Sequence, residues 1–70
     1  MKEITVYFTK TNGQKANQTF KTFTEAMERL IKDDVDKTRK VSVLVNYNGK
    51  LSTKKGSFDD VTNTLFNFWI

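Results

Sequence analysis

The stretch SFDDVTNTLFNFWI, residues 57–70, holds four of the nine aromatic residues of this 70-residue chain and predicts a closing α-helix. At about 100° per residue, its apolar side chains fall in one stripe roughly 100° wide, as in a helix that buries one face. The stripe consists of Phe58, Val61, Leu65, Phe68 and Trp69. Ser57 is a natural N-cap, and Asp60 can bond back to the Ser57 backbone N–H as a short capping box. A helix with one apolar face needs an opposite wall, which the rest of the chain must supply.

The opposite wall is predicted to be a β-sheet, because the chain opens with a period of two. The first apolar positions of this alternation are Ile4, Val6 and Phe8. We predict a three-residue loop at residues 11–13 with Gly13 in the left-handed conformation, because this register sets Phe8 opposite Ala16. A two-residue loop would pair apolar with polar side chains along the same face.

A second hairpin is predicted from the β-branched alternation that begins at Val41 and continues through Val45. By the same argument we expect a three-residue loop at residues 47–49, because it faces Val45 with Leu51 and not with a polar residue. The strand that follows, from Lys50 to about Lys54, is short and rich in Lys, which suits the edge of a sheet.

Between the hairpins the apolar period changes to about 3.6, which predicts a first helix. Its stripe is Phe23, Ala26, Met27 and Leu30. Thr22 and Glu25 form a Thr-x-x-Glu capping box at its start. We expect the helix to run to about Asp33 or Asp34 and a polar connection to follow.

The predicted order is therefore ββαββα in one domain, residues 1–70. We expect a two-layer α+β fold with a four-stranded antiparallel sheet and two helices packed on one face. Residues 11–13 match residues 47–49 at an offset of 36, and residues 22–26 match residues 57–61 at 35. These matches suggest a duplicated ββα unit, although Asn-Gly turns and Ser or Thr caps recur in unrelated segments.

The composition argues against an enzyme. With no Cys and no His, the chain has no thiolate nucleophile, and it lacks the commonest general base and metal ligand. No Gly-rich phosphate loop or nucleophile elbow is present. Asp33, Asp34 and Asp36 have a spacing similar to that of a calcium loop, but the Gly and the distal Glu that complete one are missing. We expect no catalytic residues, no cofactor and no metal.

The sequence constrains the cellular location of the protein less than its fold. No signal peptide and no apolar run of ~18 residues is evident, so we expect a cytoplasmic protein without a membrane partner. The composition, rich in Lys, Asn and Thr, suits a small accessory protein of a phage or mobile element.

Charge is segregated by element. Residues 1–21 carry +3 and residues 37–55 carry +6, whereas residues 22–36 and 57–70 carry −3 and −2, which sums to the net charge of +4. If both helices cover one face of the sheet, the other face is open and basic. The candidate partner-binding residues on it are Tyr7, Lys21, Leu44, Asn46 and Lys54.

Two functions fit such a face. The first is a small non-enzymatic interaction module, either a protein-binding inhibitor or adaptor or a subunit that associates with itself as a homodimer. The alternative is a protein that binds single-stranded DNA or RNA, whose phosphates attract Lys and whose bases stack on aromatic rings. Nucleic-acid binding should weaken steeply with salt through counterion release, while binding through an apolar surface should change little.

The closing helix generates the first testable prediction. We expect Trp69 to be buried against the sheet together with Phe58 and Leu65, so Trp69→Ala should lower the free energy of unfolding by about 3 kcal/mol. Thermal or urea denaturation measures this change. A variant that melts at the wild-type temperature would show that the closing helix has been wrongly placed.

Overall fold

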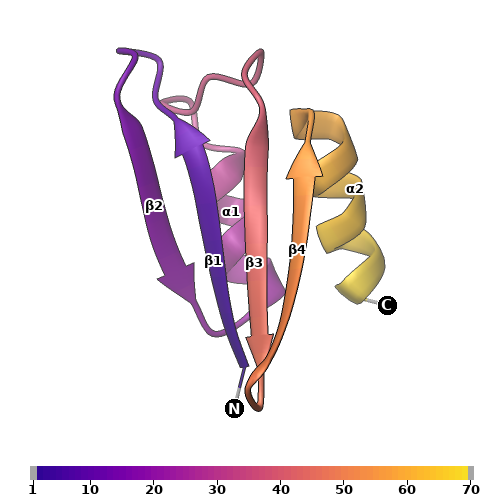
Figure 1. Ribbon diagram of the computed structural model, residues 1–70. Coiled ribbons are helices and arrows are strands. Elements are labelled where there is room, and N and C mark those ends of the chain that lie inside the picture. The colour runs from indigo at the N-terminus through magenta and orange to yellow at the C-terminus, as the bar shows by residue number, and fades with distance from the viewer. Residues whose placement is uncertain (1, 70) are drawn as a thin grey trace.

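The chain forms four strands and two helices in the predicted order ββαββα (Figure 1). The computed structural model describes the backbone of residues 2–69 and the side chains of residues 2–67. The elements are β1 (Lys2–Thr9), β2 (Lys15–Phe20), α1 (Phe23–Leu30), β3 (Val41–Tyr47), β4 (Lys50–Gly56) and α2 (Phe58–Trp69). This arrangement confirms the predicted α+β class.

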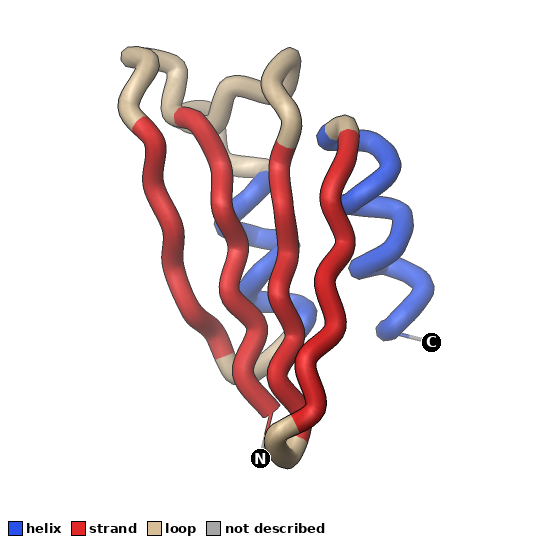
Figure 2. The backbone as a smooth tube through the Cα atoms, in the orientation of Figure 1, coloured by secondary structure: helices blue, strands red, loops and turns tan. Residues whose placement is uncertain are grey.

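The four strands form one antiparallel sheet in the order β2-β1-β3-β4. α1 lies behind the sheet in the view of Figures 1 and 2, and α2 lies beyond and partly behind the β4 edge. Both helices pack into one core on the same side of the sheet, which confirms the two-layer arrangement. α1 packs on β1 and β2, α2 packs on β3 and β4, and the helices contact each other. Each helix therefore covers its own hairpin, as expected for a repeated ββα unit, while a common ancestry of the two halves stays a prediction.

The core lies between the sheet and the helices. The central strands contribute Ile4, Val6, Phe8, Val41 and Val43, α1 contributes Phe23, Ala26, Met27 and Leu30, α2 contributes Val61 and Leu65, and the connection after α1 contributes Val35. Phe58 is partly buried against this cluster. The predicted stripes of both helices thus face the sheet as far as they are described. Phe68 and Trp69, on which the first prediction depends, lie outside the described side chains.

Both helices begin at the predicted caps. The Thr22 hydroxyl accepts a hydrogen bond from the Glu25 backbone N–H at 3.2 Å and donates one to the Glu25 carboxylate at 2.9 Å. The Ser57 hydroxyl accepts from the backbone N–H of Asp60 at 3.2 Å. These bonds satisfy N–H groups that the first helical turn leaves without an intrahelical partner.

α1 ends at Leu30, earlier than predicted, because the next residues turn back onto the sheet. The Thr11 backbone N–H donates to the Asp34 carbonyl and the Asp36 N–H donates to the Thr9 carbonyl, both at 2.8 Å. Val35, between them, is 2 % exposed. Pairing with the end of β1 and burial of Val35 therefore replace the last helical turn.

The first hairpin has the predicted register. Phe8 lies opposite Ala16, and Ile4 lies opposite Phe20. Gly13 has a φ of 89° at the end of the three-residue loop, and its N–H donates to the Lys10 carbonyl at 2.9 Å. The pairing of apolar positions was a sound guide here because α1 covers this face of β1 and β2.

The predicted register of the second hairpin is wrong. The loop has two residues, Asn48 and Gly49, so Val45 lies opposite Ser52 and Leu51 lies opposite Asn46. Asn48 and Gly49 have φ values of 52° and 87°, as a type I′ turn requires, and this turn matches the twist of the strands. Leu51 consequently points away from the helices. The apolar-pairing argument failed because β4, unlike the other edge strand β2, places no hydrophobic side chain against the core.

The two hairpins generate a matched set of glycine substitutions. Gly49→Ala and Gly13→Ala should each lower the free energy of unfolding by about 1 kcal/mol, because L-residues with a Cβ disfavour positive φ. An added Cβ meets no atom within 4 Å at either position, so the cost is conformational and not steric. Gly56→Ala is the control, because Gly56 lacks a positive φ and its Cβ would make an ordinary contact of 3.7 Å with Asp60. Equal urea midpoints for all three variants would contradict the turn assignment.

Candidate functional site: the open face of the sheet

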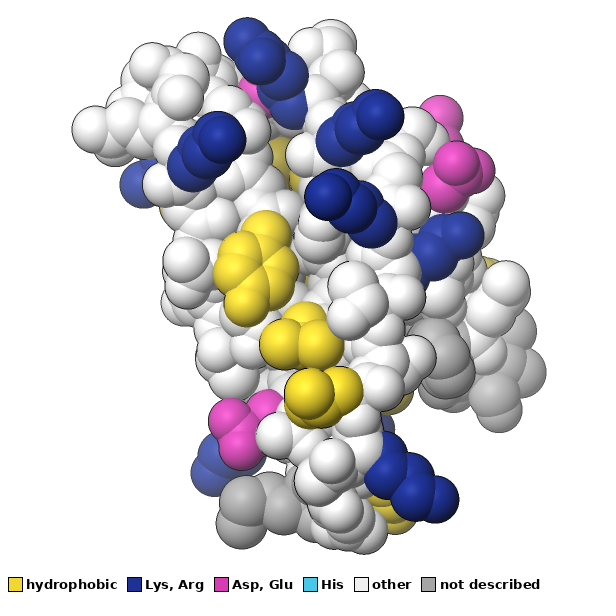
Figure 3. Space-filling model, viewed as in Figure 1, with side chains coloured by type: hydrophobic (Ala, Val, Ile, Leu, Met, Phe, Trp, Pro, Cys, Tyr) yellow, Lys and Arg dark blue, Asp and Glu magenta, His cyan; other side chains and the backbone are white. Residues whose placement is uncertain are grey.

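The side of the sheet away from the helices carries every second strand residue, and we call it the open face (Figure 3). Its members follow from the strand register, since successive side chains point to opposite faces. They are Glu3, Thr5, Tyr7 and Thr9 on β1, Lys15, Asn17 and Thr19 on β2, Ser42, Leu44 and Asn46 on β3, and Leu51, Thr53 and Lys55 on β4.

The structure places the predicted site residues in three different ways. Tyr7, Leu44 and Asn46 belong to the open face, as expected. Lys21 is exposed but follows the last residue of β2, so it lies at the margin. Lys54 does not belong to the open face, because the two-residue turn sets it opposite Val43 on the helix side. The prediction for Lys54 is therefore corrected, and Leu51 and Lys55 take its place.

Three apolar side chains form a diagonal stripe across the open face, seen in Figure 3 as the line of hydrophobic groups. We call this the apolar stripe, and it consists of Tyr7, Leu44 and Leu51. Tyr7 is 42 % exposed and Leu51 is 67 % exposed. Leu44 lies two residues from Ser42, which is opposite Tyr7, and Leu51 lies two residues from Thr53, which is opposite Leu44. Such diagonal neighbours on adjacent strands lie within reach of large side chains. The Asn-Gly dipeptide before β4 favours a two-residue hairpin and so points to Leu51 here, but Asn12-Gly13 forms a three-residue loop, so the dipeptide alone does not decide the register.

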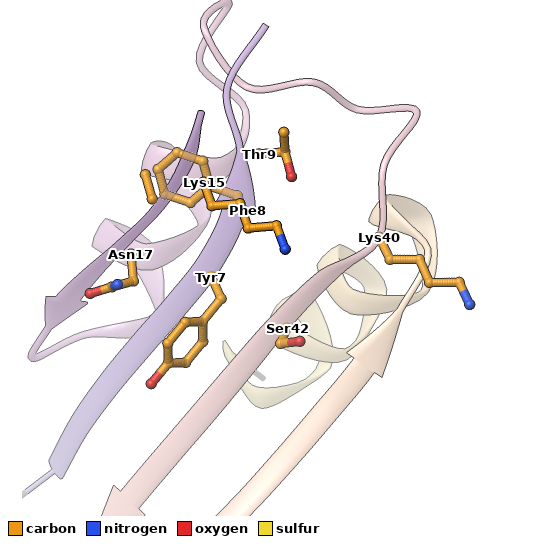
Figure 4. A pocket seen from close by; sticks show the side chains of 8 residues that line it. Tyr7, Phe8, Thr9, Lys15, Asn17, Lys40 and Ser42 are labelled. Atoms are coloured by element: carbon orange, nitrogen blue, oxygen red, sulfur yellow. The ribbon is translucent and has the colours of Figure 1, made fainter. Parts of the chain in front are cut away.

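A shallow depression of about 370 Å³ adjoins the stripe beyond Tyr7 (Figure 4). It is lined by Tyr7, Phe8, Thr9, Lys15, Ala16, Asn17, Lys40 and Ser42. Figure 4 shows the Lys15 side chain extending from β2 across β1, whereas the Lys40 side chain starts at the opposite side of the depression and extends away from Tyr7 and Lys15. Lys55 lies opposite Ser42 on β4 and borders the same end of the sheet. We call this region the basic end of the open face.

The lysines of the basic end keep their charge available. Within the part of the chain that the structure describes, the ion pairs are Arg29 with Asp34 and Arg39 with Asp36, and no lysine takes part. The basic end therefore presents lysines that form no ion pair within the described residues, beside an apolar stripe.

The connection that carries Lys40 is attached to the body of the protein by Arg29. The guanidinium donates two hydrogen bonds to the Asp34 carboxylate, at 2.8 and 2.9 Å. It also lies 4.5 Å from the Phe8 ring centroid, and its Nε donates to Gln18 at 3.2 Å. These bonds from Arg29 hold the pKa of Asp34 below its ordinary value of 3.8. Arg29 thus ties the connection to both layers of the fold.

Asp36 is held in a similar way further along the connection. The hydroxyl and the backbone N–H of Thr38 donate to the Asp36 carboxylate at 2.6 and 3.0 Å, and these bonds lower the pKa of Asp36. Asp34 and Asp36 are therefore engaged in bonds that shape the connection. The described residues contain no group of three or more Asp, Glu, His or Cys side chains placed to hold a metal ion.

Comparisons with known proteins do not assign the chain to a family. A scan against protein-family models found no match, and searches of curated proteins and of solved structures found no similar chain. Within the described residues, neither helix combines the length and the apolar character needed to cross a bilayer. A function must therefore be inferred from the chemistry of the open face itself.

The Arg29–Asp34 pair generates a prediction on pH. Because the folded-state pKa of Asp34 is lowered, its ionised form stabilises the fold above pH 3.8, and this contribution is lost as pH falls through the folded-state value. Asp34→Asn should lower the free energy of unfolding at neutral pH and flatten its decline as pH falls through 3.8 and below. Urea unfolding across this range measures both effects. Parallel declines for the wild type and Asp34→Asn would contradict the assigned role of the pair.

Proposed function

We propose that this protein is a small non-enzymatic interaction module that binds a protein partner through the open face of its sheet. The observation that supports the proposal is the apolar stripe. Leu51 is 67 % exposed in a strand, beside Leu44 and in line with Tyr7. Contiguous apolar groups with a polar surround mark interaction sites on soluble proteins more often than isolated exposed residues do.

The surround of the stripe fits a protein interface. Thr5 and Thr53 lie opposite Leu44 on the two neighbouring strands, and their short side chains leave Leu44 accessible to a flat partner surface. A protein interface typically has an apolar centre and a polar rim. On the open face, the stripe would be the centre, and the threonines with the lysines of the basic end would be the rim.

Single-stranded nucleic acid fits the same face less well. Sheet platforms that bind it typically stack two or three bases on aromatic rings. The open face has one aromatic residue, Tyr7, and the other two members of the stripe are leucines, which offer no ring to a base. The corrected register also puts Leu51 on the face and moves Lys54 off it. Each difference favours a protein partner over the nucleic-acid alternative.

Charged substitutions in the stripe test the proposal. Leu51→Asp and Leu44→Asp should each weaken partner binding at least about tenfold, because a charge buried at an interface without a counter-charge is costly. Binding is measured to the partner recovered from nuclease-treated host lysate, by titration calorimetry with purified components. Circular dichroism establishes that each variant is folded.

Ile31→Asp is the matched control for these variants. It introduces the same charge at an aliphatic residue that is 53 % exposed and follows α1, in the helix layer. Its affinity for the partner should equal that of the wild type. If all three variants bind with wild-type affinity, or if Ile31→Asp alone loses binding, the open face is not the binding surface.

A further inference from the structure

We infer that the open face recognises an acidic protein segment, one that lays aliphatic side chains on the apolar stripe and carboxylates on the basic end. This inference rests on the proposed function and adds the chemistry of the partner. The occupant is thus a different chain, which carries Asp or Glu next to Leu, Ile, Val or Phe.

The distribution of charge along the open face supports an acidic occupant. Lys15 lies opposite Thr9, Lys55 lies opposite Ser42, and Lys40 directly precedes β3, so three lysines gather at one end. Among the strand positions of the open face, Glu3 is the one acid. It lies six residues from Thr9 along β1, about 20 Å at 3.3 Å per residue, which exceeds the screening length of about 10 Å in 0.1 M salt. Glu3 therefore does little to neutralise the basic end.

The lining of the depression suits a carboxylate. Besides Lys15 and Lys40, it includes the hydroxyls of Thr9 and Ser42 and the amide of Asn17, all of which can donate hydrogen bonds. Hydrogen bonds from charged donors to carboxylates are shorter and stronger than neutral ones. A partner carboxylate seated beyond Tyr7 would thus find both charge and hydrogen-bond donors.

A second copy of this chain is a poor occupant. If two open faces met about a two-fold axis parallel to the strands, each basic end would lie on the other. About an axis across the strands, each basic end would meet the end that carries Glu3 and, at its margin, Lys21. One acid then faces three lysines in each half of the interface. The first arrangement sets like charges against each other, and the second gives three lysines a single opposing acid, so neither favours a homodimer through this face.

Selection from a peptide library identifies the preferred chemistry before the natural partner is identified. The folded full chain is immobilised and presented with random displayed peptides of about 15 residues, long enough to cross the sheet. We expect enriched sequences to place Asp or Glu beside aliphatic or aromatic residues. The most enriched peptide, made synthetically, then serves as the probe in all affinity measurements.

Charge reversals in the basic end test the contact directly. Lys15→Glu and Lys40→Glu should each weaken probe binding at least tenfold, and replacing the acidic residues of the probe by Lys should restore its binding to Lys40→Glu. Lys32→Glu is the matched control, because Lys32 is exposed and lies beside α1 near Gln18, away from the open face. Its affinity should stay within twofold of the wild-type value.

The outcomes separate this inference from the proposed function. Enriched peptides without acidic residues, no enrichment at all, or wild-type affinity in both basic-end variants would overturn the acidic partner. If the probe still loses binding with Leu44→Asp and Leu51→Asp, the interaction module stands and its partner is merely not acidic. If the probe also binds the Leu44→Asp and Leu51→Asp variants with wild-type affinity, both proposals fail.

An oligothymidylate of about 20 nucleotides tests the alternative that the open face binds single-stranded nucleic acid. An acidic protein partner predicts that this DNA binds at least tenfold more weakly than the peptide probe. Tighter binding of the DNA, lost on Tyr7→Ala and Lys40→Glu but kept by Leu51→Asp, would replace the protein partner by nucleic acid.

Discussion

Successive side chains of a β-strand point to opposite faces, so one residue more or less in a hairpin loop exchanges the two faces of the following strand. In this chain the first loop has three residues and the second has two, Asn48 and Gly49. The shorter loop turns Leu51 toward solvent and Lys54 toward the helices. The contribution of β4 to the open face, which includes Leu51 of the apolar stripe, depends on this single turn. The left-handed conformations of Asn48 and Gly49 are thus the local constraint from which the surface chemistry follows.

The sheet accepts such a turn because its strands differ in what they must bury. β1 and β3 lie at the centre, and both supply fully buried side chains such as Val6 and Val41 to the core. β4 lies at the edge, where α2 covers it only in part, and its Ser52 and Lys54 line a hollow of about 180 Å³ with Val61 and Leu65. A lysine can face a helix at an edge because its aliphatic stem covers apolar surface while its ammonium reaches water. The register of β4 is therefore free to follow its turn.

The difference in burial between the strands explains which parts of the fold the sequence predicts. The elements, the caps at Thr22 and Ser57 and the register of the first hairpin were confirmed, because periodicity and capping are local and α1 covers the first hairpin. The end of α1 was placed too late, because it is decided by the pairing of Val35 with Lys10, a contact remote in sequence. The candidate site was predicted in part: Tyr7, Leu44 and Asn46 lie on the face, whereas Lys54 does not. That error arose because apolar pairing was weighed above the Asn48-Gly49 turn for a strand, β4, that places no hydrophobic side chain against the core.

The exposure of Leu51 also has a cost in the free energy of folding. Burying a leucine side chain contributes roughly 1.5–3 kcal/mol, a substantial part of the ~5–15 kcal/mol that stabilises a small domain. With Leu51 exposed, the isolated chain forgoes that contribution and keeps an apolar group where Lys50 and Lys55 otherwise protect the edge strand from aggregation. Protection of the edge accounts for those lysines but not for a leucine among them. A partner that covered Leu51 would recover this burial on binding, which is why the exposed leucine supports the proposed interaction surface.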